Sequence, residues 1–259
     1  MSDVYAMGGT PLTALAILGY ASCDFGPAVI RNLLKGAVDK LKEAGTCLIG
    51  GHSIEDNEFK FGFAVTGVAD KHMILKSSGA AAGDILVLTK PLGTGILTSA
   101  VKLGKMKNTG LNTAISSMLT LNKASSRAAV LSGANAATDV TGFGLLGHAL
   151  NMVKGSDVNF TIFYKKVPLM NQVIHFISKG VIPGGARKNL EFCRKSITFL
   201  KHLSTEEKLA LSDPQTSGGL LIALPKKGLK KFGNIAKKTR MPYWIIGEVS
   251  KGEGSIIVQ

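Results

Sequence analysis

The stretch TDVTGFGLLGHALNM, residues 138–152, combines a carboxylate, closely spaced glycines and an apolar run. From 145 to 153 the apolar residues recur at helical spacing, which predicts a helix that opens on the glycine turn with its first amides facing an anion. The glycines also satisfy G-x-G-x-x-G, but residues 135–141 lack the pattern of a buried apolar strand and contain Asp139. A dinucleotide-binding fingerprint needs such a strand, so we reject that interpretation.

Three further segments join glycine to a carboxylate, a hydroxyl or an imidazole: SDVYAMGG at 2–9, GGHS at 50–53 and DPQTSGG at 213–219. Glycine lets backbone amides approach an anion closely, and carboxylates are hard oxygen ligands for Mg²⁺, which neutralises phosphate charge during phosphoryl transfer. Together the segments fit a magnesium nucleotide, although each alone is also an ordinary turn. The sequence has no G-x-x-x-x-G-K-S/T motif, so a phosphate site here is not a P-loop.

Two histidines follow glycines in these segments, His52 after Gly51 and His148 after Gly147. An imidazole at such a place donates to a phosphate, moves a proton or simply fills a structural position. The residues themselves leave these alternatives open.

The net charge is +14, from 31 Lys plus Arg against 17 Asp plus Glu. The densest basic cluster lies in an amphipathic helix predicted at 228–239, whose charged residues are best read as a solvated face. Only 6% of residues are aromatic, and none of the basic stretches interleaves lysines with stacking rings, so a nucleic-acid partner is disfavoured.

The three cysteines, Cys23, Cys47 and Cys193, are widely spaced and form no C-x-x-C pair. This spacing favours neither a disulfide framework nor a zinc ribbon, and it fits a reducing, cytoplasmic setting. No apolar run reaches transmembrane length, so we expect no membrane partner.

Hydrophobic periodicity predicts an alternation of helices and strands along the chain. This alternation favours layers of helices against a sheet, with a domain boundary near residue 75. The predicted helices are 28–44, 93–104, 110–131, 144–154, 205–211 and 228–239, and the predicted strands are 46–50, 60–68, 84–89, 158–163, 219–224 and 243–249.

In this order the segments resemble selenophosphate synthetase (selenide, water dikinase), a family of the aminoimidazole ribotide synthetase (PurM-like) superfamily. Matching text also includes FGFAVTGV at 61–68, LTKPLGTGILTSA at 88–100 and PGGARKN at 183–189, so the resemblance covers essentially the whole chain. It implies an α+β fold with an incomplete N-terminal αβ domain at 1–75, which serves ATP binding and dimerisation, and a C-terminal layered αβ domain at 76–259.

The resemblance also implies the family's reaction, in which ATP, selenide and water give selenophosphate, AMP and orthophosphate, with Mg²⁺ holding the phosphates. By position, Asp3 would bind Mg²⁺ and contact ATP, Asp139 would be a second magnesium ligand, and Gly50, Gly51 and His52 would line the nucleotide. The DPQTSGG segment would shape the site. A homodimer and a selenium-delivery protein are the implied partners.

The sequence departs from the family pattern at its front. Family members carry a reactive Cys or selenocysteine, a Lys and an acidic metal-binding pair before the SDVYAMGG motif, and nothing before Met1 corresponds to them. Cys23 lies downstream of the motif and is not that nucleophile, so we assign no catalytic nucleophile. We expect this chain by itself to bind magnesium nucleotide poorly and to make no selenophosphate.

Three alternatives remain open from the sequence. One is another ATP-dependent enzyme of the superfamily, which selenide dependence would distinguish. Another is a non-catalytic paralogue that regulates or binds proteins of selenium metabolism. The third is a basic nucleic-acid-binding module, which would bind a duplex in a salt-sensitive way.

Overall fold

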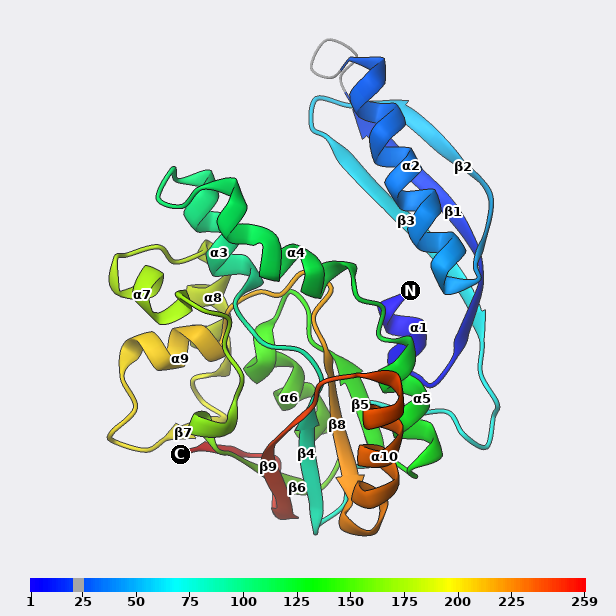
Figure 1. The fold of residues 1–259 in the computed structure, drawn as a ribbon. Helices are drawn as coiled ribbons and strands as arrows, with labels where there is room; N and C mark the ends of the chain where they lie inside the picture. Colours follow the sequence, from blue (N-terminus) through cyan, green and yellow to red (C-terminus); the bar gives the residue numbers. More distant parts are fainter. Residues whose placement is uncertain (21–25) are drawn as a thin grey trace.

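A computed structural model describes residues 1–20 and 26–259. It contains a three-stranded sheet near the N-terminus and a seven-stranded sheet that forms the body of the molecule (Figure 1). Cys23 lies outside the described residues, whereas Cys47 is exposed and Cys193 is buried, and both are free thiols. No described helix has the length and apolar character that a membrane crossing needs.

The small sheet is built around β1 (Thr10–Tyr20), which pairs in parallel with β2 (Cys47–Glu55) and antiparallel with β3 (Lys60–Val68). Helix α2 (Pro27–Ala44) runs along this sheet and projects with it from the body (Figure 1). The prediction for this helix is confirmed, since proline opens it and Gly45, at φ +76°, ends it. Strand β2 is longer than predicted because pairing with β1 continues as far as Tyr20.

The large sheet has the order β5-β8-β4-β9-β6-β10-β7 and is antiparallel from β5 to β6 and parallel from β6 to β7. Its strands are β4 (Asp84–Leu88), β5 (Ala136–Asp139), β6 (Val158–Ile162), β7 (Ile197–Phe199), β8 (Leu220–Pro225), β9 (Trp244–Lys251) and β10 (Ile256–Val258). The strands predicted near 84, 158, 219 and 243 are thereby confirmed.

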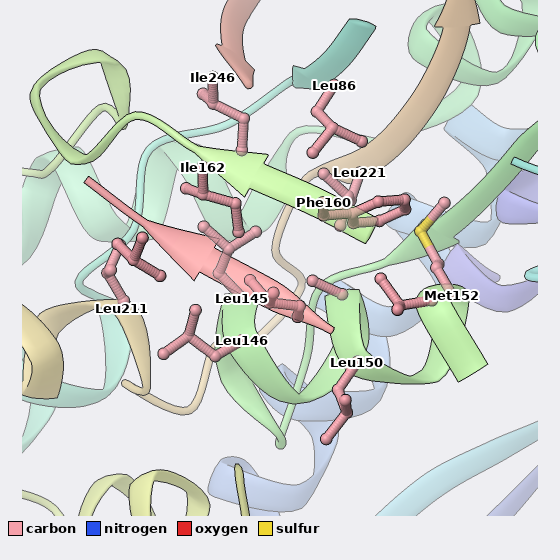
Figure 2. Close-up of a cluster of buried hydrophobic side chains, with 14 of the residues drawn as sticks. Leu86, Leu145, Leu146, Leu150, Met152, Phe160, Ile162, Leu211, Leu221 and Ile246 are labelled. Carbon is pink, nitrogen blue, oxygen red and sulfur yellow. The ribbon is translucent and has the colours of Figure 1, made fainter. Parts of the chain in front are cut away.

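Helices cover both faces of the large sheet, so its central strands are buried throughout. Along β4, Leu86 and Leu88 point to one apolar core, and Ile85 and Val87 point to another. The first core lies against α6 (Gly144–Lys154) and is drawn in Figure 2. The second lies against α5 (Lys123–Leu131) and α10 (Leu229–Thr239).

The remaining helices are short, and several form a third apolar cluster beside the sheet. The helix predicted over 110–131 is interrupted at Thr120, whose ψ of 121° is extended and ends α4. The remaining helices are α1 (Ser2–Ala6), α3 (Thr94–Lys102), α4 (Asn112–Leu119), α7 (Val173–Ser178), α8 (Gly184–Cys193) and α9 (Thr205–Leu211), with 3₁₀ turns η1 (Asn108–Leu111), η2 (Tyr164–Lys166) and η3 (Lys226–Gly228).

The interpretation of residues 135–141 as a stretch without a buried strand is wrong. Residues Ala136–Asp139 form β5, and both alanines are buried between the helix layers. Small alanines hid this strand because they lack the β-branched and aromatic residues that mark strands in sequence. The dinucleotide interpretation still fails, because β5 is an edge strand that pairs antiparallel with β8, so β5 and α6 do not begin a parallel β-α-β unit.

Candidate functional site

A cavity of about 470 Å³ lies where α1, the end of β5 and the break between α4 and α5 meet. Its wall is completed by the loop that enters β8. Its polar lining includes Ser2, Asp3, Tyr5, Lys40, Lys90, Thr120, Asn122, Asp139, Thr141 and Ser217.

The two carboxylates predicted as magnesium ligands both line this cavity. Asp3 lies in the first turn of α1, and Asp139 is the last residue of β5 and only 7% exposed. Both carboxylates act electrostatically on one imidazole, that of His148. Segments 136 positions apart in the chain therefore converge on one site.

These side chains offer an incomplete ligand set for a metal ion. The described part of the chain contains no cluster of three or more His, Cys, Asp or Glu side chains arranged to hold one. Two carboxylates at a cavity still fit Mg²⁺, because this ion usually keeps several waters and phosphate oxygens as ligands and takes only one or two carboxylates from the protein.

His148 has a structural contact in the glycine turn. Its Nε2 accepts a hydrogen bond from the Thr141 backbone N–H at 3.0 Å and lies 3.2 Å from the Thr141 hydroxyl. Burial lowers the pKa of His148, and the carboxylates of Asp139 and Asp3 only partly oppose this effect. The neutral imidazole thus holds Thr141 at the cavity wall, which answers the question that the sequence left open.

The DPQTSGG segment fastens the cavity wall to the start of α3. The Gln215 side-chain oxygen accepts hydrogen bonds from Gly93 N–H at 3.0 Å, Thr94 N–H at 3.2 Å and the Thr94 hydroxyl at 3.1 Å. The Gln215 backbone N–H donates to the Thr141 carbonyl at 2.9 Å. One glutamine therefore ties a helix start to the turn beside Asp139.

Asp213 in the same segment is fully buried and has an unusual environment. Its Oδ2 accepts from Gly95 N–H at 3.1 Å and from the Gln215 side-chain amide at 2.8 Å, while its Oδ1 has no hydrogen-bond partner among the described residues. Burial raises the pKa of Asp213 to about 7, against the lowering effect of hydrogen bonding to the Gln215 side chain and to the Ile96 and Gly95 backbone. Asp213 does not line the cavity, and its hydrogen bond from Gly95 joins the loop to the start of α3.

The two glycines that close the segment allow close approaches of backbone to backbone. A Cβ at Gly218 would lie 2.0 Å from the Val140 carbonyl oxygen, and one at Gly219 would lie 2.4 Å from the Lys90 backbone nitrogen. These contacts bring the loop against both Asp139 and Lys90. The sequence assigned this segment the role of shaping the site, and the contacts give a physical basis for that role.

Sequence reasoning missed several polar residues of the cavity, among them Lys90 and Asn122. Lys90 donates to the Thr120 carbonyl at 2.6 Å and to the Ser217 carbonyl at 2.8 Å. Asn122 donates to the Ser2 hydroxyl at 3.0 Å and to the Gly218 carbonyl at 2.8 Å, which links α1 to the loop. The only signal for Lys90 was its place in LTKPLGTG, and Asn122 had none.

Gly50, Gly51 and His52 do not line the cavity. They lie on β2, and His52 pairs with Ile17, seven residues from the start of β1, or about 23 Å along the strand at about 3.3 Å per residue. The backbone itself requires glycine at these two positions. Gly50 adopts φ +148° at a bulge, and a Cβ at Gly51 would lie 2.2 Å from a carbonyl oxygen of β1.

Family models match both parts of the chain. Residues 1–69 match AIR synthase related protein, N-terminal domain, and residues 81–259 match AIR synthase related protein, C-terminal domain. Selenide, water dikinase of Aeromonas salmonicida (strain A449) is 41% identical over 259 residues, which are 100% of this chain and 74% of the relative. Selenide, water dikinase of Bordetella bronchiseptica is 45% identical over 249 residues, covering 96% of this chain and 72% of the relative.

Solved structures of other proteins share the fold. Thiamine-monophosphate kinase from Stenotrophomonas maltophilia K279a has a TM-score of 0.75 at 18% identity and covers 100% of this chain and 75% of its own. Hydrogenase maturation protein HypE has a TM-score of 0.72 at 15% identity and covers 99% of this chain and 75% of its own. These likenesses and the family models confirm the predicted α+β fold of the AIR synthase type.

Proposed function

Because this chain belongs to the selenide, water dikinase family, we propose that it serves the synthesis of selenophosphate from selenide, ATP and water, with AMP and orthophosphate as further products. Among the structural observations, the one that best supports this proposal is that Asp3 and Asp139 line the same cavity. Its volume of about 470 Å³ lies within the range of small-molecule sites.

We assign tasks in binding the nucleotide to the two carboxylates, to the turn at Thr141 and to the DPQTSGG loop. Asp3 and Asp139 hold Mg²⁺, which when bound supplies charge neutralisation to the phosphates. The Thr141 N–H is already engaged by His148, so the turn is held in place before the nucleotide arrives. The DPQTSGG loop keeps the cavity wall in register with β5 through Gln215.

Binding and turnover test the proposal separately. We expect ATP binding to be weak but dependent on Mg²⁺, and Asp139→Asn to weaken it further and to remove its dependence on Mg²⁺. Asp157→Asn, at an exposed carboxylate on the surface, is the matched control. Binding that is equal in the Asp139→Asn variant and the control would rule out the assigned site.

Selenide dependence tests the reaction itself. AMP release that needs both ATP and selenide is the signature of this activity, and AMP release at the same rate without selenide would point to another enzyme of the superfamily. The binding experiment reports on the cavity even where AMP release is slow.

We further propose that the small sheet forms a homodimer contact. Its outer face exposes Leu15, Ile17 and Ile49 at 44%, 53% and 58%, an unusual concentration of large apolar side chains. His52 lies beside Ile17 in the sheet. A second copy on this face would bury these residues and give Gly50, Gly51 and His52 a route to a nucleotide held by the partner. Sedimentation of wild type and Ile17→Asp tests this, with a monomer expected for the variant only.

A further inference from the structure

Lys90 is a buried lysine without a carboxylate partner. Its side chain is only 5% exposed, and its ammonium donates to the carbonyls of Thr120 and Ser217 at 2.6 and 2.8 Å. No ion pair of the described residues includes it. Burial lowers the pKa of Lys90 to about 8, and repulsion from Lys40 adds to this effect.

An ammonium carries three N–H donors, and neutral carbonyls use two of them in Lys90. A buried charge without a counter-ion is costly, and proteins usually pair it. Lys90, Thr120 and Ser217 all line the cavity, so the ammonium lies in the cavity wall. An anionic ligand in the cavity would supply a compensating negative charge within reach of this ammonium.

The charges around the cavity support this conclusion. Lys40, the other lysine of the lining, already pairs with Glu43 and donates to the Leu119 carbonyl at 2.7 Å. The carboxylates of Asp3 and Asp139 face the same cavity without pairing with Lys90. Two carboxylates alone would repel a phosphate, so an ammonium without an ion-pair partner in the same cavity wall makes the cavity suitable for one.

We propose that Lys90 binds a phosphate oxygen in this cavity, through the N–H that the two carbonyls leave unused. The inference rests on the proposed function, since it names a further nucleotide-binding residue of the same site. The phosphate belongs either to the nucleotide or to the orthophosphate released from it, and both present the same oxygen chemistry, which pyrophosphate as a probe shares. The carbonyls of Thr120 and Ser217 orient the ammonium toward this ligand.

A purely structural role for Lys90 predicts a different result. If Lys90 only fastens the Thr120 and Ser217 segments together, Lys90→Met destabilises the fold and leaves the affinity of the folded protein unchanged. If Lys90 binds phosphate, the same variant weakens phosphate binding by the folded protein, whatever its effect on the denaturant concentration at which the protein unfolds.

The experiment measures calorimetric binding of ATP with Mg²⁺, of inorganic phosphate and of pyrophosphate. We expect Lys90→Met to weaken binding of the phosphate ligand about ten- to a hundredfold, as for a lost hydrogen bond to a charged group. Lys90→Arg should retain more affinity than Lys90→Met because it keeps the charge. Lys230→Met, at an exposed lysine of α10, is the control for a general loss of positive charge.

The pH dependence supplies a readout that a structural role would not produce. Wild-type binding should weaken from pH 7 to pH 9, because the ammonium of the free protein loses its proton near pH 8. Lys90→Met should lack this slope. The other charged or titratable groups facing Lys90 are Lys40, Asp3, Tyr5, Asp139 and Arg240, and the comparison of the two proteins removes their contributions.

Failure of the two proposals would look different. Equal affinities and equal pH slopes in wild type and Lys90→Met would overturn the role of Lys90 and leave the proposed function standing. Binding of phosphate or pyrophosphate but not of ATP, lost in Lys90→Met, would support Lys90 and overturn the nucleotide site. Absence of binding by every probe would overturn both. Should Lys90→Met fail to fold, the wild-type pH slope and Lys90→Arg decide the question.

Discussion

Asp213 makes the stability of this protein depend on pH in a direction opposite to that of most carboxylates. Burial raises its pKa from the ordinary value of 3.8 to about 7, so the folded protein binds this proton where the unfolded chain has released it. The stabilisation linked to this proton is complete below pH 3.8, falls as the pH rises and is lost above pH 7. Replacing the group by its uncharged counterpart, Asp213→Asn, should abolish this loss.

The size of the effect follows from the two pKa values. At about 1.4 kcal/mol per pH unit, the difference between 3.8 and about 7 amounts to about 4 kcal/mol over the full range. Between pH 5 and pH 8 the free energy of unfolding of wild type should fall by about 3 kcal/mol relative to that of Asp213→Asn. Other titrating groups cancel in this comparison because both proteins contain them.

Urea unfolding followed by circular dichroism at pH 5, 6, 7 and 8 measures this difference. The control is Asp157→Asn, which removes an exposed carboxylate from the loop after α6. The amide of Asp213→Asn can keep one oxygen as acceptor for Gly95 N–H and the Gln215 amide. Parallel stability curves for wild type and Asp213→Asn would refute the reasoning, because they would mean that Asp213 titrates alike in the folded and unfolded states.

Three further substitutions test the packing around the site. His148→Gln keeps an acceptor for Thr141 but cannot titrate, so it should remove the part of the wild-type stability that is lost as the pH falls below 6.5, and an unchanged pH slope would contradict the buried neutral imidazole. Gly218→Ala should cost about 1–3 kcal/mol or more in urea unfolding, because its Cβ meets a carbonyl oxygen at 2.0 Å, whereas Gly184→Ala, with nothing within 4 Å, should be nearly neutral. Phe232→Ala, on the buried face of α10, should cost about 3–5 kcal/mol and Phe192→Ala, 63% exposed, far less, so similar losses would mean that the burial is wrongly assigned.

The sequence was sufficient for elements with a strong local pattern. Helix α2 shows apolar spacing between a proline and a glycine that end it, and α6 opens on the glycine turn as predicted. The sequence was insufficient for β5, whose alanines carry no strand signal, and for the break at Thr120, which lies inside a continuous helical pattern. In both places pairing or packing with distant residues overrides local propensity.

For the candidate site, too, the sequence predicted some features and not others. Asp3 and Asp139 stood out in the sequence because carboxylates beside glycine turns suggest a magnesium nucleotide, and the glycine motif at 50–52 stood out for the same reason. Local chemistry identifies such residues one by one but does not say which of them meet. The large sheet and α1 bring the two carboxylates to one cavity, whereas the pairing of β2 with β1 carries His52 away from it.

What the sequence determined by itself was the kind of chemistry and the family, since short motifs preserve residue types and their order along the chain. Only the tertiary structure decided that Lys90 is a buried cation without a counter-ion, that His148 holds Thr141, and that Asp213 keeps its proton near neutral pH. These properties arise from desolvation, which depends on the packing of the whole chain, and for Lys90 from contacts with residues 30 and 127 positions away in the sequence.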